Sequence, residues 1–151
     1  MHSYKTAMAR KKPSLPTRYL YKKGLVIGPV VDYGCGKGFD TKYLKSVGIE
    51  TVGYDPYWNP KKIDNKNFYN TIICNYVLNV VEEKYQRNIL ESINSLLSNE
   101  GNAYIAVRRD VKKDGPTSRG FQRNVILDLE TVHKKSGAYH IYLMKKNNLP
   151  S

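Results

Sequence analysis

The stretch VVDYGCGKGFD, residues 30–40, constrains the fold of this chain more than any other part of it. A short apolar run ends at Asp32, and glycines follow at every second position, Gly34, Gly36 and Gly38. Glycines allow tight turns and a close approach of the backbone to a ligand, and such loops follow the first strand of an open parallel sheet. We therefore expect an α/β fold with a ligand site at this loop.

The rest of the chain alternates between strand and helix patterns. Strands are predicted at 29–32, 49–55, 69–75, 102–110, 125–133 and 138–146, and helices at 17–24, 40–48 and 82–101. Asp40 or Thr41 is the expected N-cap of the second helix, Gly101 the expected end of the third, and residues 110–124 a polar loop. The pattern predicts an α/β sandwich whose mostly parallel sheet ends in a C-terminal antiparallel hairpin.

Length and composition limit the class of protein. A chain of 151 residues suits one domain with a real core. No run of 18 apolar residues predicts a membrane-spanning helix, and the N-terminus lacks the apolar stretch of a secretory signal. Cys35 and Cys74 have no disulfide or zinc spacing. We therefore expect a cytoplasmic protein with reduced thiols and no metal site.

The charge of the chain is high and uneven. Lysine and arginine total 25 against 13 acidic residues, which gives a net charge of +12. One basic cluster lies in residues 1–23, which contain no acid, and a second lies between Arg108 and Arg123. Clustered positive charge attracts polyanions, although a surface selected for solubility has the same composition. The expected partner is nucleic acid, either DNA or RNA, and nothing indicates the oligomeric state.

The acid before the glycine loop distinguishes between ligands. A dinucleotide fingerprint spaces its glycines G-x-G-x-x-G, whereas this chain has G-x-G-x-G. Asp32 would repel a pyrophosphate, but it would pair with an ammonium group. Asp55, at the end of the second predicted strand, is placed to accept both hydroxyls of a ribose. An ammonium group and a ribose in one ligand describe S-adenosylmethionine.

The segments VVDYGCGKG and VGYDP resemble the class I, Rossmann-like S-adenosylmethionine-dependent methyltransferases. A closer resemblance, over roughly residues 5–110, is to the methyltransferases associated with DNA phosphorothioation systems. Its matches are Thr6-Ala7-Met8, Arg10-Lys11, Ser14, Pro16, Arg18, Asp32 to Gly36, Asp40, Asp55-Pro56 and Tyr76 to Val80. The resemblance implies a compact Rossmann-like methyltransferase sandwich. Only 16 residues, 56–71, replace the usual helix and third strand, so this region is shortened, with KKID at 61–64 as a possible remnant of the strand.

The resemblance also implies a set of site residues. The implied cofactor contacts are Asp32, Gly34, Cys35, Gly36, Gly38, Asp55, Pro56, Asp64 and Asn75. Asp64 would reach the adenine amino group, and the alternative is that it is a solvated loop acid. Asn75 and Tyr76 are the implied catalytic pair, because amino-methylating DNA enzymes carry an Asp/Asn-Pro-Pro-Tyr motif at this place. Both prolines are absent here, and the alternative is that Asn75 lines the cofactor pocket while Tyr76 packs.

The loop after residue 108 carries the residues expected to contact the methyl acceptor. They are Arg109, Lys112, Lys113, Arg119 and Phe121, the cations on phosphates and the phenyl ring on a base; a mobile lid is the alternative. The predicted organisation is a basic leader with a short helix at 1–24 and a single S-adenosylmethionine-binding domain at 25–151. The predicted function is S-adenosylmethionine-dependent methylation of nucleic acid. The alternatives are methylation of a small molecule or protein, and a non-catalytic cofactor-binding module.

Overall fold

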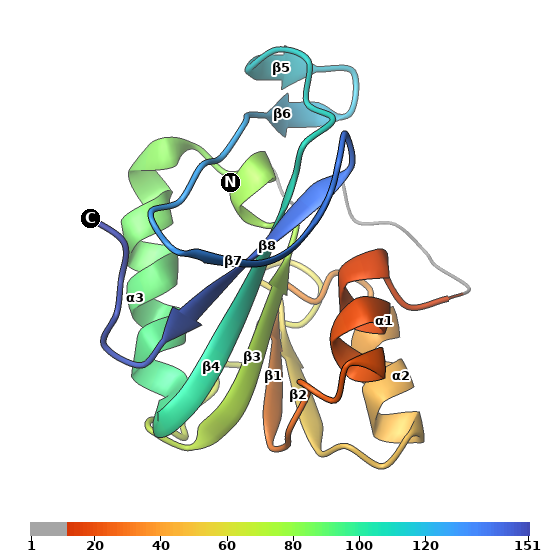
Figure 1. Ribbon diagram of the computed structural model, residues 1–151, viewed down its shortest axis with the longest axis vertical. Helices are drawn as coiled ribbons and strands as arrows, with labels where there is room; N and C mark the ends of the chain where they lie inside the picture. Colours follow the sequence, from red (N-terminus) through yellow and green to blue (C-terminus); the bar gives the residue numbers. More distant parts are fainter. Residues whose placement is uncertain (1–11) are drawn as a thin grey trace.

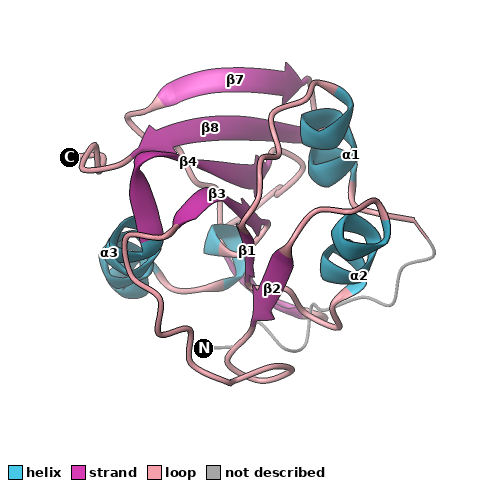
Figure 2. Cartoon of the chain, turned by 90° about the horizontal axis from the view of Figure 1, so that it is seen from below, coloured by secondary structure: helices cyan, strands magenta, loops and turns pink. Residues whose placement is uncertain are grey.

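A computed structural model describes residues 12–151, which form a six-stranded sheet with helices on both faces (Figure 1). Figure 2 shows α3 (Gln86–Leu96) on one face, and α1 (Leu15–Lys22) and α2 (Phe39–Ser46) on the other. The expected α/β sandwich is therefore confirmed. Residues 1–11 lie outside the described part, and with them the first two matches of the leader and part of its basic cluster.

The sheet has a parallel half and an antiparallel edge. Its spatial order is β2 (Thr51–Tyr54), β1 (Val30–Tyr33), β3 (Tyr69–Asn75), β4 (Leu97–Arg108), β8 (Tyr139–Lys145) and β7 (Glu130–Lys135). The first four strands are parallel, and β8 runs antiparallel to both of its neighbours. Two short 3-10 helices, Leu78–Val80 and Glu83–Tyr85, join β3 to α3. The predicted C-terminal hairpin is therefore confirmed.

The region expected to hold a third strand contains none. The described residues between β2 and β3 form turns and coil, so KKID at 61–64 is not a strand, and that prediction is wrong. As a result, β2 is the edge strand of the sheet. The sequence indicated a shortened third-strand region, and in the structure this region lacks the strand altogether.

Two predicted helix ends are also wrong. Gly38, with a φ of 86°, occupies the N-cap of α2, so Asp40 lies inside the first turn and its carboxylate is free for a different role. The third helix ends at Leu96 and not at Gly101, because Leu97 is buried and pairs with Tyr69 at the start of β4. Tertiary pairing overrides the local stop signal here.

Two hydrophobic clusters hold the layers together. Alternate residues of β4 face opposite sides of the sheet. Ala103, Ile105 and Val107 pack in the cluster under α3, whereas Tyr104 and Ala106 pack in the cluster under α1 and α2. The same alternation in β1 and β3 directs Asp32 and Asn75 to the side of α1 and α2, as their neighbours two residues earlier, Val30 and Ile73, are in that cluster.

The helix of the predicted leader belongs to the same packed unit. Leu20 of α1 is fully buried in the cluster under α1 and α2. The ring of Tyr19 stacks on His133 of β7, with 3.8 Å between centroids. Ser14 and Thr17 are buried as well. The N-terminal end of α1 is therefore fixed against the sheet, at the edge where the parallel strands end.

Residues 110–124, predicted as a loop, contain a small hairpin of β5 (Gly115–Thr117) and β6 (Gly120–Gln122) above the sheet (Figure 1). Arg123 anchors its end. Its buried guanidinium donates hydrogen bonds to Val81 O at 2.8 Å and Gln86 Oε1 at 2.7 Å. Asn79 exchanges two further bonds with the backbone of Arg123. Arg123 is thus a structural residue.

Candidate active site

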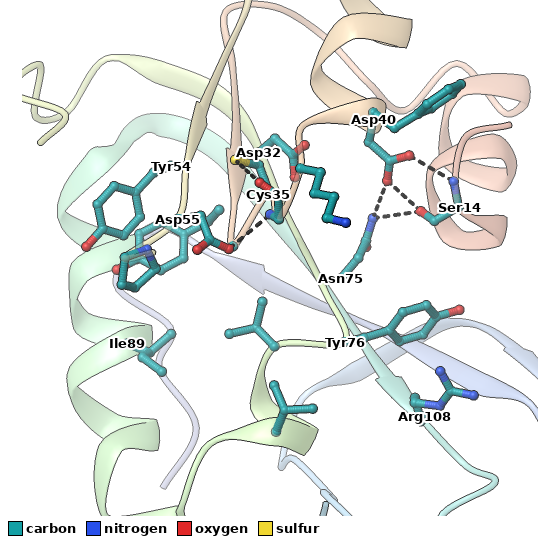
Figure 3. A pocket seen from close by; sticks show the side chains of 18 of the residues that line it. Ser14, Asp32, Cys35, Asp40, Tyr54, Asp55, Asn75, Tyr76, Ile89 and Arg108 are labelled. Atoms are coloured by element: carbon teal, nitrogen blue, oxygen red, sulfur yellow. Dashed lines mark hydrogen bonds between the residues drawn. The ribbon is translucent and has the colours of Figure 1, made fainter. Parts of the chain in front are cut away.

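A pocket opens at the edge where the parallel strands end, the usual ligand position in open α/β sheets (Figure 3). Its lining combines the glycine loop, the end of β2, the end of β3 and the first residue before α1. The lining residues are Ser14, Asp32, Tyr33, Gly34, Cys35, Gly36, Lys37, Phe39, Asp40, Tyr54, Asp55, Pro56, Asn75, Tyr76, Val77, Val80, Ile89, Arg108 and Gln122. Eight of the residues implied from sequence are thereby brought together: Asp32, Gly34, Cys35, Gly36, Asp55, Pro56, Asn75 and Tyr76.

The glycine loop is held in a conformation that needs glycine. Gly34 and Gly36 have φ angles of 81° and 55°, in the left-handed region. The amides of Gly34 and Cys35 both donate to Tyr54 O, at 2.6 and 2.9 Å. A Cβ on Gly34 would overlap the side chain of Val77. The loop therefore lies close against the ends of β2 and β3, with its backbone lining the pocket.

Asp55 is buried at the end of β2 and anchors the loops around it. Its Oδ2 accepts the Gly36 amide at 3.0 Å, and its Oδ1 accepts the amides of Tyr57 and Trp58 at 2.9 and 3.0 Å. A carboxylate accepts about four hydrogen bonds, so about one position remains for a ligand hydroxyl. The expectation that Asp55 accepts both ribose hydroxyls therefore needs revision, because the protein itself uses most of this carboxylate.

Asp32 is buried below the glycine loop and accepts a hydrogen bond from Thr41 Oγ1 at 2.7 Å. Burial, together with the nearby negative charges of Asp40 and Asp55, raises the pKa of Asp32 to about 7. Three carboxylates therefore share the inner end of the pocket, and none of them forms a salt bridge with another described residue. A cationic ligand would relieve this concentration of negative charge.

Asp40 forms the centre of a hydrogen-bonded cluster that links α1, α2 and β3. Its carboxylate accepts the Ser14 amide at 2.8 Å, the Ser14 hydroxyl at 2.6 Å and the Thr17 hydroxyl at 2.9 Å. The side-chain amide of Asn75 donates to Ser14 Oγ at 3.1 Å and Thr17 Oγ1 at 2.8 Å. Figure 3 shows Asp40, Ser14 and Asn75 pointing toward one another. We refer to Ser14, Thr17 and Asp40 as the Asp40 cluster.

Tyr76 follows Asn75 in a strained conformation. Its φ of 64° lies in the left-handed region, which is costly for a residue with a large side chain. The guanidinium of Arg108 lies over its ring at 5.3 Å from the centroid. Arg108 also forms a two-pronged ion pair with Asp110, at 2.8 and 2.7 Å, and this hydrogen bonding lowers the pKa of Asp110. Strain of this kind concentrates at functional sites, which favours a role for the end of β3.

A second hollow adjoins the pocket, and Arg108 and Gln122 line both. We call it the basic hollow, because its other cations are Lys112, Lys113 and Arg119. The side chains of these three residues are exposed and make no ion pair with any described residue. Asp110 and Asp114 also line the hollow, so its surface carries both signs of charge with an excess of cations.

Two residues expected to contact the acceptor do not line either cavity. The guanidinium of Arg109 donates to Val125 O at 2.5 Å and to the hydroxyl of Tyr142 at 2.6 Å, on the side of the sheet away from Asn75. Phe121 lies half-buried in β6 and is absent from both linings. The placement of Arg109 corrects its prediction as a substrate contact. The alternation of side chains along a strand could have predicted this placement. Val107 faces α3, and Arg109, two residues later, therefore faces the same side.

Two implied cofactor residues also lie outside the pocket lining. Gly38 caps α2, and Asp64 is an exposed acid in the coil before β3, as in the alternative interpretation of that residue. Conversely, the sequence assigned no site role to Ser14, Lys37, Tyr54, Arg108 or Gln122, all of which line the pocket. Ser14 and Asp40 were noted only as matches of the resemblance, Asp40 also as a helix cap. The same alternation along β4, which turns Arg109 away from the pocket, predicts that Arg108 faces the pocket. No comparable local signal marks the others.

The two cysteines have the properties of unreactive thiols. Both are free, and burial raises the pKa of Cys35 to about 12 and that of Cys74 beyond its ordinary range. In residues 12–151 no group of His, Cys, Asp and Glu side chains has the arrangement of a metal site. No helix in this part of the chain has the length and apolar character required to cross a membrane.

The fold and the pocket define a class I methyltransferase. A family model described as a methyltransferase domain matches residues 4–136, and no curated protein matches the chain. Three similar solved structures share the fold. A TehB-like SAM-dependent methyltransferase from Corynebacterium glutamicum is 18% identical, with a TM-score of 0.61 and 87% of both chains covered. The 1,6-didemethyltoxoflavin-N1-methyltransferase of Burkholderia thailandensis, solved with 1,6-didemethyltoxoflavin and S-adenosylhomocysteine, is 19% identical, with a TM-score of 0.60 and 86% of this chain and 75% of that chain covered.

The third structure is described by the conversion of a disulfide bond into a thioacetal group during echinomycin biosynthesis. It is 21% identical to this chain, with a TM-score of 0.57. The match covers 65% of this chain and only 51% of that one, so the chain spans about half the length of this neighbour. The family model covers most of the chain, and the chain therefore belongs to this methyltransferase-domain family. It is an S-adenosylmethionine-dependent methyltransferase.

Proposed function

We propose that this methyltransferase acts on nucleic acid. The observation that carries the proposal is the basic hollow, which adjoins the methyltransferase pocket and carries the unpaired cations Lys112, Lys113 and Arg119. An acceptor whose reactive group enters the pocket would extend its neighbouring phosphates over these cations. The resemblance of the glycine motif and leader to the methyltransferases associated with DNA phosphorothioation systems supports DNA as the acceptor.

The pocket residues fit the methyl donor. Gly34 and Gly36 would let the donor approach the backbone, Asp32 would face its ammonium group, and the remaining acceptor position of Asp55 would receive a ribose hydroxyl. S-adenosylmethionine supplies a methyl group on a positively charged sulfonium. The contribution of the chain is then to align an acceptor at the end of β3, where Asn75 and Tyr76 lie beside Arg108.

A small-molecule acceptor is the second candidate, because the similar Burkholderia enzyme is named for a small aromatic substrate. The two candidates differ in their dependence on salt. If about four to six phosphates are engaged, the logarithm of affinity for duplex DNA falls against the logarithm of salt with a slope of about −4 to −5. A small acceptor releases few counterions, so its slope is close to zero.

The test combines this salt titration with methyl transfer. Fluorescent DNA and RNA oligomers are titrated in the presence of S-adenosylhomocysteine, and labelled S-adenosylmethionine is used to measure transfer to the same oligomers. Replacing Lys112, Lys113 and Arg119 by alanine is expected to flatten the slope by about two to three units while leaving cofactor affinity unchanged.

A matched triple change to alanine, at Lys22, Lys45 and Lys145, removes the same charge away from the pocket, in the last turns of α1 and α2 and at the end of β8. It is expected to leave most of the slope in place. A salt response that is flat in the unaltered protein, or equal loss in the two triple variants, would contradict a nucleic-acid acceptor and favour the small molecule.

A further inference from the structure

The polar side chains at the boundary between the pocket and the basic hollow differ in how far the fold already uses them. The amide of Asn75 donates to the Asp40 cluster, and the guanidinium of Arg108 donates to Asp110 through two nitrogens. Gln122 lines both cavities, as Arg108 does, but its side chain makes no hydrogen bond with any other described residue. Its amide thus keeps both a donor and an acceptor for a ligand.

The amide of Gln122 is also accessible. Among the buried and half-buried residues of the described chain, one side-chain polar atom is both enclosed and without a hydrogen bond, and this atom is Asn75 Oδ1. Gln122 is half-buried and its amide has no partner, so its Oε1 and Nε2 must both keep accessible surface. A ligand that extends from the pocket into the basic hollow can therefore contact them.

The backbone on both sides of Gln122 is held by the fold. Gln122 is the last residue of β6 and pairs with Gly115 of β5. The next residue, Arg123, exchanges two hydrogen bonds with the buried Asn79, at 2.8 and 2.9 Å. The side chain of Asn79 also accepts the amide of Arg108 at 2.7 Å. One buried asparagine therefore joins the end of β6 to the end of β4, and Gln122 projects from a fixed support.

A side-chain amide places one donor group beside one acceptor, so it fits a partner that has an acceptor beside a donor. Phosphate oxygens only accept hydrogen bonds, whereas the edges of nucleobases combine both kinds of group. In the major groove of B-form DNA, adenine is the single base that presents a donor next to an acceptor, its N6 amino group and N7. Glutamine and asparagine are the usual partners of this edge. The chemistry of Gln122 is thus suited to adenine.

The surroundings of Gln122 match duplex DNA in shape and charge. The major groove admits a two-stranded β-ribbon, and β5 and β6 form such a ribbon above the sheet (Figure 1). Arg119 lies in its turn, and Lys112 and Lys113 lie on the segment that leads into it, which gives the hollow its excess of cations. Enzymes that modify a base take it out of the stack, so the pocket would hold the methylated base while its neighbour stays paired beside the hollow.

We propose that Gln122 recognises an adenine next to the methylated base, with Nε2 donating to N7 of the adenine and Oε1 accepting from its N6 amino group. This inference rests on the proposed methylation of nucleic acid, and it narrows the acceptor to duplex DNA with an adenine beside the target. Gln122 is a specificity-determining residue, because it contacts the neighbouring base and not the methyl group. Its replacement changes the preference for DNA sequence and leaves the affinity for the methyl donor as it is.

The first experiment measures base preference by binding. Three duplexes of equal length are titrated in the presence of S-adenosylhomocysteine: alternating adenine and thymine, the same duplex with 7-deazaadenine for adenine, and alternating guanine and cytosine. The unaltered protein is expected to bind the first duplex at least about fivefold more tightly than either of the others, because an amide–adenine pair discriminates by this order. Gln122→Leu is expected to bind all three within about twofold of one another.

Two further variants separate recognition from a structural effect. Gln122→Glu keeps the size but loses the donor, and a carboxylate accepts from cytosine N4, so its preference is expected to shift toward the guanine–cytosine duplex. Asn99→Leu removes an exposed amide of β4 that lines neither cavity, and it is expected to keep the preference of the unaltered protein. A preference for adenine that survives Gln122→Leu, or that Asn99→Leu abolishes equally, overturns the inference.

The second experiment locates the adenine relative to the methyl group. Random-sequence duplex DNA is methylated with labelled donor and digested to dinucleotides, which are identified by mass spectrometry. With the unaltered protein, adenine is expected on one side of the methylated base in at least about half of the products, and with Gln122→Leu in about a quarter, as chance gives for four bases. An adenine share of about a quarter with the unaltered protein contradicts the inference.

The salt dependence of binding distinguishes failure of the inference from failure of the proposed function. A steep salt slope with equal affinities for the three duplexes overturns the recognition of adenine and leaves a nucleic-acid acceptor in place. A flat salt slope, together with no methyl transfer to DNA, refutes the nucleic-acid acceptor and the inference with it.

Discussion

Asp32→Asn tests whether the buried carboxylate of this site serves a ligand at the expense of stability. In the folded protein the pKa of Asp32 is raised from 3.8 to about 7, chiefly by burial and then by Asp40. Because one pKa unit corresponds to about 1.4 kcal/mol, the ionised carboxylate destabilises the ligand-free fold by about 4 kcal/mol above pH 7. Asparagine keeps the shape and still accepts the hydrogen bond of Thr41.

The sign and the pH range follow from the two pKa values. Below pH 3.8 the carboxyl is protonated in both the folded and unfolded states, so its contribution to stability is complete there. As the pH rises from 3.8 through about 7, the unfolded chain releases its proton while the folded protein retains it, and stability is lost. Asp32→Asn is therefore expected to stabilise the protein at pH 8. At pH 5 the stabilisation by the same substitution is expected to be smaller by about 2–3 kcal/mol.

Urea denaturation of both proteins at pH 5 and pH 8, without ligand, measures these differences. The same titrations with saturating S-adenosylhomocysteine are expected to narrow or reverse the advantage of Asp32→Asn, because the variant lacks the counter-charge for an ammonium group. A variant that is less stable than the parent at pH 8, or a stability difference that is the same at both pH values, would refute this reasoning.

Three further predictions concern stability and binding. Gly34→Ala is expected to lower the free energy of unfolding by about 2–4 kcal/mol in urea denaturation. The new Cβ would overlap the side chain of Val77, and a φ of 81° is unfavourable for alanine. An unchanged denaturation midpoint would contradict this. Asp55→Ala is expected to weaken S-adenosylhomocysteine by about 1.5–3 kcal/mol in calorimetry and to lower the melting temperature, as three backbone amides lose their acceptor; loss of affinity without loss of stability would show that the anchoring role is unimportant. Arg123→Met is expected to destabilise by about 2–3 kcal/mol and to leave the salt slope of nucleic-acid binding intact, since its guanidinium is buried; a flatter slope would place Arg123 on the acceptor surface.

Local features of the sequence determined the class of this protein. The glycine spacing after Asp32, the acid at the end of β2 and the alternation of strand and helix patterns predicted a parallel sheet with a ligand loop. The structure has a sheet with a parallel half, and the glycine loop lines a pocket at its edge. These signals are legible because they act over a few residues: a glycine is required where φ is positive, and apolar periodicity follows the geometry of one element. The end of α3 at Leu96 could not be predicted in this way, since the pairing of Leu97 with Tyr69 decides it.

Only the tertiary structure decided how the pocket is equipped. Ser14, Asp40 and Asn75 are separated by 26 to 61 positions along the chain, and their hydrogen bonds exist because α1 and α2 begin, and β3 ends, at one edge of the sheet. The tertiary structure also separates the basic residues of the 108–123 segment. Arg109 and Arg123 form hydrogen bonds within the fold, whereas Lys112, Lys113 and Arg119 stay exposed. Composition counts these cations alike, whereas packing separates them, because a buried guanidinium must find acceptors and an exposed ammonium is satisfied by water.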